Sequence, residues 1–466
     1  MSRCGWPDTG IGVRLDPFSG PEVLAPGKVL AEAQARQHAG ALSTKAASGS
    51  GLLHPWQKPH SEAMTAQTSW KVVIGLISPR LHAWHWAVFI TVASLAGCAT
   101  PIDRVRINQV QVIGTHNSYH LRAHPSLLKL VGLRSPETAQ GLDYSHRPLP
   151  EQLSRLGIRQ IELDCFADPK GGLYADPLGP KRAAALGLPP VPDYDPAGRL
   201  RAPGFKVMHV QDLDYFSSVL TLVEGLQQVR AWSERHPRHF PIFILLELKE
   251  GQPDPALTRP VPFGELELDP LEAEILSVVP RERILTPDDV RGGAPTLPEA
   301  LRQHGWPNLK AARGKIIFGL DNEGPVRDLY LKGHPALAGR LAFVSVPPSN
   351  PAAAWMKEND AVANFDRIQG LVKAGFLVRT RADADTVEAR TNDTRRRDKA
   401  LASGAQFIST DYPEANLDLS PYVVRFDGAI VVRTNPVNGN PSLQGADLEN
   451  GHARQRRSSE VFRVTR

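Results

Sequence analysis

Acidic side chains recur in two short apolar runs near the middle of the chain. Glu162 and Asp164 are two residues apart, so in an extended strand both carboxylates point to the same face. Glu247 lies near the end of a second apolar run, residues 242–248. Two carboxylates directed into one interior repel each other unless a proton or a cation separates them. The pattern therefore predicts a cation site that joins the two runs.

Asn117 adds a neutral amide oxygen to this candidate site. Several carboxylates with one amide oxygen form a hard, all-oxygen ligand set, which suits Ca2+, with Mg2+ as the alternative. A purely structural network is the competing interpretation, in which Lys249 or Arg159 pairs with the carboxylates.

Two histidines could move protons beside such a cation. His116 immediately precedes Asn117, and His209 ends another apolar run. Imidazole exchanges protons near neutral pH, and a metal that neutralises a phosphate oxygen between a base and an acid can cleave a phosphodiester. A single histidine at the end of a strand is more often structural. Five candidates at successive strand ends nevertheless favour a catalytic site.

Eight short apolar runs, rich in β-branched residues, indicate the strands that position these candidates. They span residues 110–115, 159–163, 206–209, 242–248, 315–320, 341–346, 376–380 and 406–410. Apolar residues at helical spacing precede most of them, in residues 149–156, 220–235, 297–304, 360–374 and 386–403. The connection over residues 166–205 is rich in Pro and Gly and is expected to be a long loop.

Alternating strands and helices predict an α/β fold with a parallel sheet, and eight such units predict a slightly irregular (β/α)8 TIM-type barrel. The active sites of such barrels lie at the C-terminal ends of the strands. The candidate residues lie at or near these ends, so the fold and the chemistry support each other.

Residues 64–98 are typical of an export signal. Lys71 and Arg80 supply positive charge, residues 86–96 are apolar, and the segment ends in Leu-Ala-Gly-Cys98. This ending resembles the bacterial lipobox, in which the cysteine is lipidated and the signal is removed. We predict an exported protein that is anchored at the bacterial cell envelope through Cys98. A secreted or periplasmic protein with an ordinary signal peptide is the alternative.

The catalytic domain is assigned to residues 101–424. Residues 1–63 are rich in Gly, Pro, Ser and Ala and precede Met64, which indicates a disordered leader or an over-extended gene start. Residues 425–466 form a C-terminal tail with one strand-like piece, residues 429–433. The rest of the tail is rich in Asn, Gly and Arg and is expected to fray.

The composition is that of an ordinary globular protein, with 41% hydrophobic and 22% charged residues among 466. A net charge of +5 is compatible with an anionic lipid or phosphate substrate. Nucleic acid is not expected as a partner, because the basic residues are not interleaved with aromatic residues. The three cysteines show no metal-ligand spacing, which excludes a zinc site built on them. We expect a monomer without a protein partner.

Four motifs resemble the barrel of the phosphoinositide phospholipases C. Gly-Thr-His-Asn-Ser-Tyr at residues 114–119 resembles the opening motif of that family, and Ile-Glu-Leu-Asp at 161–164 is similar to its second-strand motif. Residues 241–247 resemble the strand that supplies a further acidic ligand. Residues 408–413 are similar to the last strand of related lipid phosphodiesterases. The resemblance is to the bacterial Ca2+-dependent branch and covers about residues 105–416.

The resemblance implies a role for each matching residue. The Ca2+ ligands would be Asn117, Glu162, Asp164 and Glu247. His116 would stabilise the phosphorane-like transition state, and His209 would protonate the leaving oxygen of diacylglycerol. The inositol 2-hydroxyl would attack phosphorus with help from Glu162, which gives diacylglycerol and a cyclic inositol phosphate that water can then open.

Three further residues are candidate contacts to the phosphate or substrate: Lys249, Asp321 and Arg379. For Arg379 and Arg381, a solvent-exposed place on the barrel rim is the competing expectation. The eukaryotic members of the family carry lysines late on the fifth strand that hold ring phosphates. Residues 315–321 end in Leu-Asp instead, which favours plain phosphatidylinositol as the phospholipid substrate.

Two alternatives to this function remain. A glycerophosphodiester phosphodiesterase shares the barrel and the metal, but that family resembles His-Arg-Gly at the first strand, where this chain has His116-Asn117-Ser118. Asp212, close behind His209, resembles that family's His-Asp pair at the third strand. The other alternative is a catalytically silent surface lipoprotein that only binds lipid, against which the full set of histidines and carboxylates counts.

Overall fold

The computed structural model describes residues 100–450 and 452–453 of the chain. The predicted leader (1–63) and export segment (64–98) lie outside these residues. Among the residues that are described, no helix combines the length and the apolar character needed to cross a bilayer.

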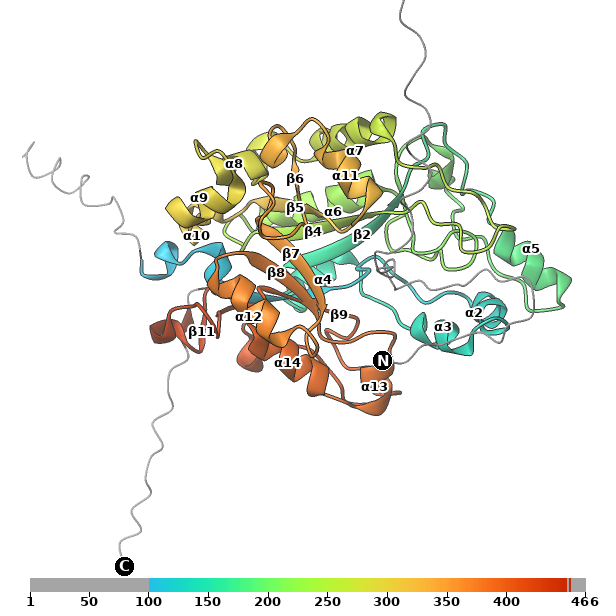
Figure 1. Ribbon diagram of the computed structural model, residues 1–466. Helices are drawn as coiled ribbons and strands as arrows, with labels where there is room; N and C mark the ends of the chain where they lie inside the picture. Colours follow the sequence, from blue (N-terminus) through green and yellow to red (C-terminus); the bar gives the residue numbers. More distant parts are fainter. Residues whose placement is uncertain (1–99, 451, 454–466) are drawn as a thin grey trace, which may run out of the picture. The chain divides into compact units, whose positions relative to one another are not determined.

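Eight parallel strands form a barrel, and helices surround it (Figure 1). The strands are β1 (Val110–Thr115), β2 (Gln160–Phe166), β4 (Ile242–Leu248), β5 (Ile316–Leu320), β6 (Ala342–Val344), β7 (Trp355–Asp360), β8 (Leu377–Arg381) and β9 (Phe407–Thr410). They pair in the order β6-β5-β4-β2-β1-β9-β8-β7. A parallel bridge between Ser345 and Trp355 joins β6 to β7 and brings the two ends of the sheet together. The predicted α/β barrel is therefore confirmed.

The prediction of residues 206–209 as a barrel strand is wrong. This segment contains the short strand β3 (Lys206–Val207), which pairs antiparallel with the end of β2. The eighth barrel strand is instead β7, whose sequence Trp-Met-Lys-Glu-Asn-Asp lacks β-branched residues and therefore does not read as a strand. Because β3 stays outside the ring, β2 pairs directly with β4.

The helices agree with most of the predicted ranges. Three match within two residues: α4 (Leu149–Arg155), α6 (Leu222–Arg235) and α9 (Leu297–Gln303). The helix predicted over residues 360–374 is the shorter α12 (Phe365–Lys373), because β7 extends to Asp360. The helix predicted over residues 386–403 is two helices, α13 (Val387–Thr391) and α14 (Arg395–Ser403). They separate at Asn392, which has a left-handed φ of 52°.

The remaining helices are α2 (Pro125–Gly132), α3 (Pro136–Gly141), α5 (Leu178–Ala185), α7 (Glu265–Val278), α8 (Pro287–Arg291), α10 (Leu309–Ala312) and α11 (Pro325–Leu331). In Figure 1, α7, α8, α9 and α11 lie along one side of the strands, and α12 and α14 lie along the other. The connection between β2 and β3 is mostly loop, as predicted, but it also contains α5 and a 3-10 turn at Arg199–Arg201.

Aromatic side chains fill the barrel near the N-terminal ends of its strands. The ring of Phe243 on β4 stacks on that of Phe407 on β9 with centroids 4.6 Å apart, and meets Trp355 on β7 at 5.5 Å. Gly319 on β5 makes room for them, because a Cβ atom there would lie 2.6 Å from Phe243 Cζ. Since apolar rings occupy this end, polar side chains that point into the barrel gather toward the C-terminal ends of the strands.

The segment that follows the barrel packs against it. Strand β10 (Val432–Thr434) pairs antiparallel with β1, and a two-stranded ribbon of β11 (Ala446–Asp447) and β12 (His452–Ala453) comes after it. Glu449 forms a buried ion pair with Arg159, which immediately precedes β2. The strand-like piece predicted at residues 429–433 corresponds to β10, and the expected fraying after it does not hold for residues 434–449.

A buried histidine before β4 is expected to make the fold sensitive to acid. His239 is 2% exposed, and its Nε2 lies 2.7 Å from Ser233 Oγ. Burial lowers the pKa of His239 to about 4, and the positive charge of Arg159 acts in the same direction. The unfolded chain binds this proton near pH 6.5. Stability is therefore highest above that pH and falls as the pH drops toward 4.

We expect His239 alone to lower the free energy of unfolding by about 2 kcal/mol between pH 7 and pH 5. Urea denaturation of the wild type and of His239→Gln at both pH values measures this contribution, because the variant should lose that part of the pH dependence. The exposed His236→Gln is the matched control and should behave like the wild type. Identical pH dependence in His239→Gln and the wild type would contradict the expectation.

Candidate active site

Four carboxylates from three adjacent strands converge at the C-terminal end of the barrel. Asp164 on β2 is the register partner of Glu247 on β4. Glu162, Glu247 and Asp321 each offer one oxygen, and these three atoms lie within 4.8 Å of one another. Glu162, Asp164 and Asp321 are buried, whereas the Glu247 side chain is 34% exposed. We call these four residues the acidic cluster. The structure brings together the three predicted carboxylates and adds Asp321.

Several buried oxygens at this place accept no hydrogen bond. Within the described part of the chain, these are Oδ1 of Asn117, Oδ1 of Asp164 and Oδ1 of Asp321. Oδ2 of Asp164 faces the ammonium group of Lys249 at 3.2 Å. Buried acceptors without a partner are costly, so native sites normally satisfy them. Ca2+ takes roughly six to eight oxygen ligands, so this set of donors fits that ion. Asn117 itself has a left-handed φ of 42°, a backbone strain that is typical of functional sites.

Three basic side chains, Lys249, Arg379 and Lys357, partly neutralise the acidic cluster. Lys249 Nζ lies 3.2 Å from Asp164 Oδ2 and 3.3 Å from Glu247 Oε1. Arg379 donates to Glu162 Oε2 at 2.6 Å. The candidate substrate contacts Lys249 and Arg379 are therefore paired with candidate metal ligands.

Asp321, the third candidate contact, pairs with Lys357 of β7 at 3.0 Å. Arg379 and Arg381 are 1% and 6% exposed, so the expectation that they stand on a solvated rim is wrong. The error follows from β8, whose five residues are all buried despite two arginines. These arginines meet carboxylates inside the barrel instead of water.

His116 belongs to a charge network that closes across β1 and β9. Its Nδ1 lies 2.9 Å from Asp411 Oδ1, and Arg381 donates to Asp411 Oδ2 at 3.0 Å. Thr115 and Thr410 are register partners on the two strands, so the residues that follow them become neighbours. Asp411 was not among the predicted site residues, although it lies inside the motif at residues 408–413. Arg381 was a candidate phosphate contact, for which a place on the rim was the competing expectation.

The position of His116 ties it to the acidic cluster. Its Nε2 lies 3.8 Å from Glu162 Oε1. Burial lowers the pKa of His116 to about 3, and Arg381 adds to this effect. In the same place, burial raises the pKa of Glu162 to about 7, while Arg379 opposes the shift. A neutral imidazole therefore faces a carboxyl group that can take up a proton near neutral pH.

His209 is held by an aspartate that it shares with a second histidine. His209 Nδ1 lies 2.8 Å from Asp214 Oδ2, and His120 Nε2 lies 3.1 and 3.0 Å from the two Asp214 oxygens. The ring of His120 stacks on Tyr144 with centroids 4.3 Å apart. Asp214 and His120 are fully buried. Neither residue was predicted as part of the site, because both act through tertiary contacts that no local motif reveals.

The arrangement can support acid–base cleavage of a phosphodiester. Each of the two predicted histidines has its Nδ1 on a carboxylate, which fixes the ring and opposes the lowering of its pKa by burial. The unsatisfied oxygens of Asn117 (after β1), Asp164 (on β2) and Asp321 (after β5) offer a place for a hard cation. His209 follows β3, and β3 pairs with the end of β2 just beyond Asp164.

The family model for phosphoinositide phospholipase C, Ca2+-dependent, matches residues 105–436. The chain belongs to this family. The match covers every barrel strand and β10. Membership of this family confirms the predicted activity: the protein is a Ca2+-dependent phospholipase C that acts on phosphoinositide lipids. The family match favours the phospholipase C function over the glycerophosphodiesterase alternative. No curated protein matches the chain.

Solved structures of bacterial phospholipases C are similar to this one. The Ca2+-dependent phosphatidylinositol-specific enzyme from Streptomyces antibioticus is 17% identical, with a TM-score of 0.44 over 71% of this chain and 99% of that one. The calcium-dependent phosphoinositol-specific enzyme from a Pseudomonas species is 14% identical. Its TM-score is 0.41 over 72% of this chain and 97% of that one.

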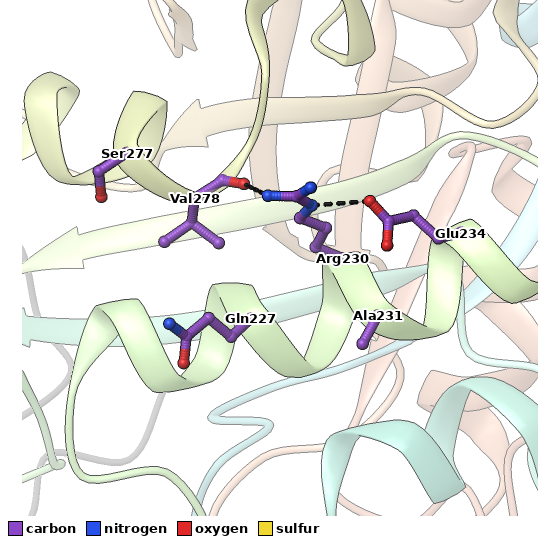
Figure 2. A pocket seen from close by; sticks show the side chains of 6 residues that line it. All are labelled: Gln227, Arg230, Ala231, Glu234, Ser277 and Val278. Atoms are coloured by element: carbon purple, nitrogen blue, oxygen red, sulfur yellow. Dashed lines mark hydrogen bonds and ion pairs between the residues drawn. The ribbon is translucent and has the colours of Figure 1, made fainter.

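A hollow elsewhere on the phospholipase lies between α6 and α7 (Figure 2). In it, Arg230 donates to the carbonyl oxygen of Val278 and to Glu234, both at 2.8 Å. The lining residues come from the outer helices and include none of the acidic cluster. We therefore do not assign the lipid site to this hollow.

The contact between Asp411 and His116 leads to a testable prediction for this phospholipase. Asp411→Asn removes the negative charge that orients the His116 imidazole. We expect kcat to fall roughly tenfold or more, as part of the 10²–10⁴-fold that an acid–base group contributes, with a smaller change in KM. Steady-state kinetics on phosphatidylinositol measure the change, and the exposed Asp418→Asn is the matched control. Wild-type kcat in Asp411→Asn would show that His116 does not depend on this contact.

Proposed function

We propose that the enzyme cleaves phosphatidylinositol by attack of the inositol 2-hydroxyl on phosphorus, with His209 as general acid and Glu162 as general base. The observation that carries the proposal is the set of buried, unsatisfied oxygens beside two histidines that are each fixed by an aspartate. The residues that would hold Ca2+ are Asn117, Glu162, Asp164 and Glu247. When bound, the ion supplies positive charge that offsets the charge on the phosphate oxygens.

The base in this proposal is Glu162. Burial raises the pKa of Glu162 to about 7 when no ion is bound. Bound Ca2+ would lower this pKa and keep Glu162 a carboxylate, the form that accepts the proton of the 2-hydroxyl. Arg379 holds Oε2 of the same carboxylate at 2.6 Å and fixes its position. As the hydroxyl oxygen forms a bond to phosphorus, the bond from phosphorus to the glycerol oxygen breaks.

The acid in this proposal is His209. Asp214 accepts from Nδ1, so we assign proton donation to Nε2, which gives its proton to the departing glycerol oxygen. The products are diacylglycerol and a cyclic inositol phosphate, which water can open by the reverse proton transfers. We assign His116 to stabilising the charge on the pentacoordinate transition state, a role for which Nε2 must carry a proton; Asp411 on Nδ1 favours that protonated form.

We propose plain phosphatidylinositol as the preferred headgroup. Strand β5 is followed by Asp321, a buried carboxylate, where a basic side chain would be needed to hold a ring phosphate. Like charges repel, so additional phosphates near this position would bind less well. Competition between phosphatidylinositol and its bisphosphate in mixed vesicles tests the preference.

We also propose that the enzyme is exported, lipidated at Cys98 and monomeric. The order of positive charge, apolar stretch and Leu-Ala-Gly-Cys98 in the sequence supports the anchor. Mass spectrometry of the protein from its native membrane fraction would detect the lipid on Cys98. Recovery of the wild type in a soluble, unlipidated form would overturn the anchor, and light scattering of detergent-solubilised protein tests the monomer.

The catalytic proposal is tested by product analysis. Purified enzyme is given phosphatidylinositol vesicles with Ca2+ or with EGTA, and diacylglycerol and inositol phosphates are followed. We expect Ca2+-dependent release of diacylglycerol and a cyclic phosphate, with large losses in His116→Ala and His209→Ala. Release of a free alcohol from deacylated diesters alone would support a glycerophosphodiesterase instead. Absence of turnover with either substrate would support the lipid-binding alternative.

A further inference from the structure

We infer that Asp321 is a direct Ca2+ ligand of this phospholipase, an addition to the four ligands proposed above and resting on that proposed site. Asp321 follows β5, and its backbone N–H donates to the Leu246 carbonyl at 2.8 Å. This bond places it beside Glu247, the neighbour of Leu246 on β4. One of its carboxylate oxygens lies within 4.8 Å of oxygens of Glu162 and Glu247.

The two oxygens of Asp321 have different surroundings. Lys357 Nζ contacts Oδ2 at 3.0 Å and also donates to the Asp321 carbonyl oxygen at 2.6 Å. These two contacts fix the carboxylate. Oδ1 of Asp321 is buried and has no hydrogen bond, and the residue as a whole is only 7% exposed. An unsatisfied, immobilised oxygen beside two other carboxylates is what a cation ligand requires.

Each of the neighbouring carboxylates also has one oxygen paired with a basic side chain. Arg379 contacts Oε2 of Glu162, and Lys249 contacts Oε1 of Glu247. Each of the three carboxylates therefore has a basic partner on one oxygen, and one oxygen from each lies within 4.8 Å of the other two, close enough to share an ion. Since Ca2+ takes roughly six to eight oxygens, a further carboxylate fits within ordinary coordination.

A direct contact between Asp321 and the substrate phosphate is less favourable. Both groups are negative, so they repel each other unless a cation lies between them. The role as a ligand removes this conflict, because Asp321 then faces the ion and the phosphate approaches the ion from another side. Lys357 is accordingly a positioning residue for Asp321 rather than a phosphate contact.

The test compares Ca2+ affinity in three full-length variants and the wild type by isothermal titration calorimetry, without lipid. Asp321→Asn is expected to weaken Ca2+ binding roughly tenfold or more, because it removes a charged ligand. The double variant Asp321→Asn/Lys357→Met restores the net charge of the site and spares Lys357 a buried position without its partner. If Asp321 is a ligand, the double variant stays as weak as Asp321→Asn. The exposed Asp418→Asn is the matched control and should bind like the wild type.

Three results would be decisive. Recovery of wild-type affinity in the double variant would overturn the inference, because the effect of Asp321 would then be electrostatic at a distance. Unchanged affinity in Asp321→Asn with a raised KM for phosphatidylinositol would also overturn it and make Asp321 a substrate contact. Either result leaves the proposed function intact if the wild type binds Ca2+ and cleaves lipid. A wild type that binds no Ca2+ would overturn both. Thermal melting without Ca2+ shows that each variant is folded.

Discussion

Replacement of His209 by alanine is expected to lower kcat for phosphatidylinositol roughly 10²–10⁴-fold, which is the usual contribution of a general acid. The glycerol oxygen then leaves without a proton. Ca2+ affinity should stay close to the wild-type value, because His209 contacts Asp214 and lies outside the acidic cluster. Steady-state kinetics and calorimetry separate the two quantities, and the exposed His236→Ala, before β4, is the matched control. A loss of less than about fivefold would exclude His209 as the acid.

Asp214 provides a second way to examine the same acid. The carboxylate of Asp214 raises the pKa of His209 against the larger, lowering effect of burial. Asp214→Asn should therefore lower that pKa and move the alkaline limb of the kcat profile to lower pH. It should also reduce kcat less than His209→Ala does, because the imidazole is still present. A purely structural role for Asp214 would reduce activity without moving the profile.

The sequence was sufficient to predict the barrel, because most of its strands are buried on both faces and read as continuous aliphatic runs. Strand β4, Ile-Phe-Ile-Leu-Leu-Glu-Leu, is the clearest example. Strand β7 escaped prediction because its interior positions carry Lys357 and other polar residues that serve the site. The apolar residues at 206–209 suit a strand, but they pair antiparallel with the end of β2. Only the tertiary structure decides whether such a segment enters the ring.

The same reasoning explains how far the site could be predicted. Glu162, Asp164 and Glu247 stand on strands, where the alternation of side chains fixes the face they occupy. Their partners are set by closure of the barrel. Asp411 and His116 are 295 positions apart in the chain and come into contact because β1 and β9 are paired. No local sequence pattern predicts the register of that pairing. Lys357 reaches Asp321 only because β6 and β7 meet.

The largest effect on stability is expected from Glu449, in the segment that was predicted to fray. Glu449 pairs with Arg159, and the two side chains are 9% and 4% exposed. It also accepts from the backbone N–H of Phe240 at 2.8 Å, so it joins the starts of β2 and β4 to the C-terminal segment. Glu449→Ala leaves the guanidinium of Arg159 buried without its carboxylate. Breaking such a pair costs about 3–5 kcal/mol.

Urea denaturation of Glu449→Ala measures this loss, and the chain contains a matched control. Arg147 and Glu414 form an ion pair at 2.6 Å, but their side chains are 36% and 43% exposed. Glu414→Ala should therefore cost far less, because water solvates the arginine that is left. Glu449 lies beyond residue 436, where the family match ends. A large loss in Glu449→Ala alone would make this segment part of the catalytic domain, whereas equal, small losses would mean that it only covers the barrel.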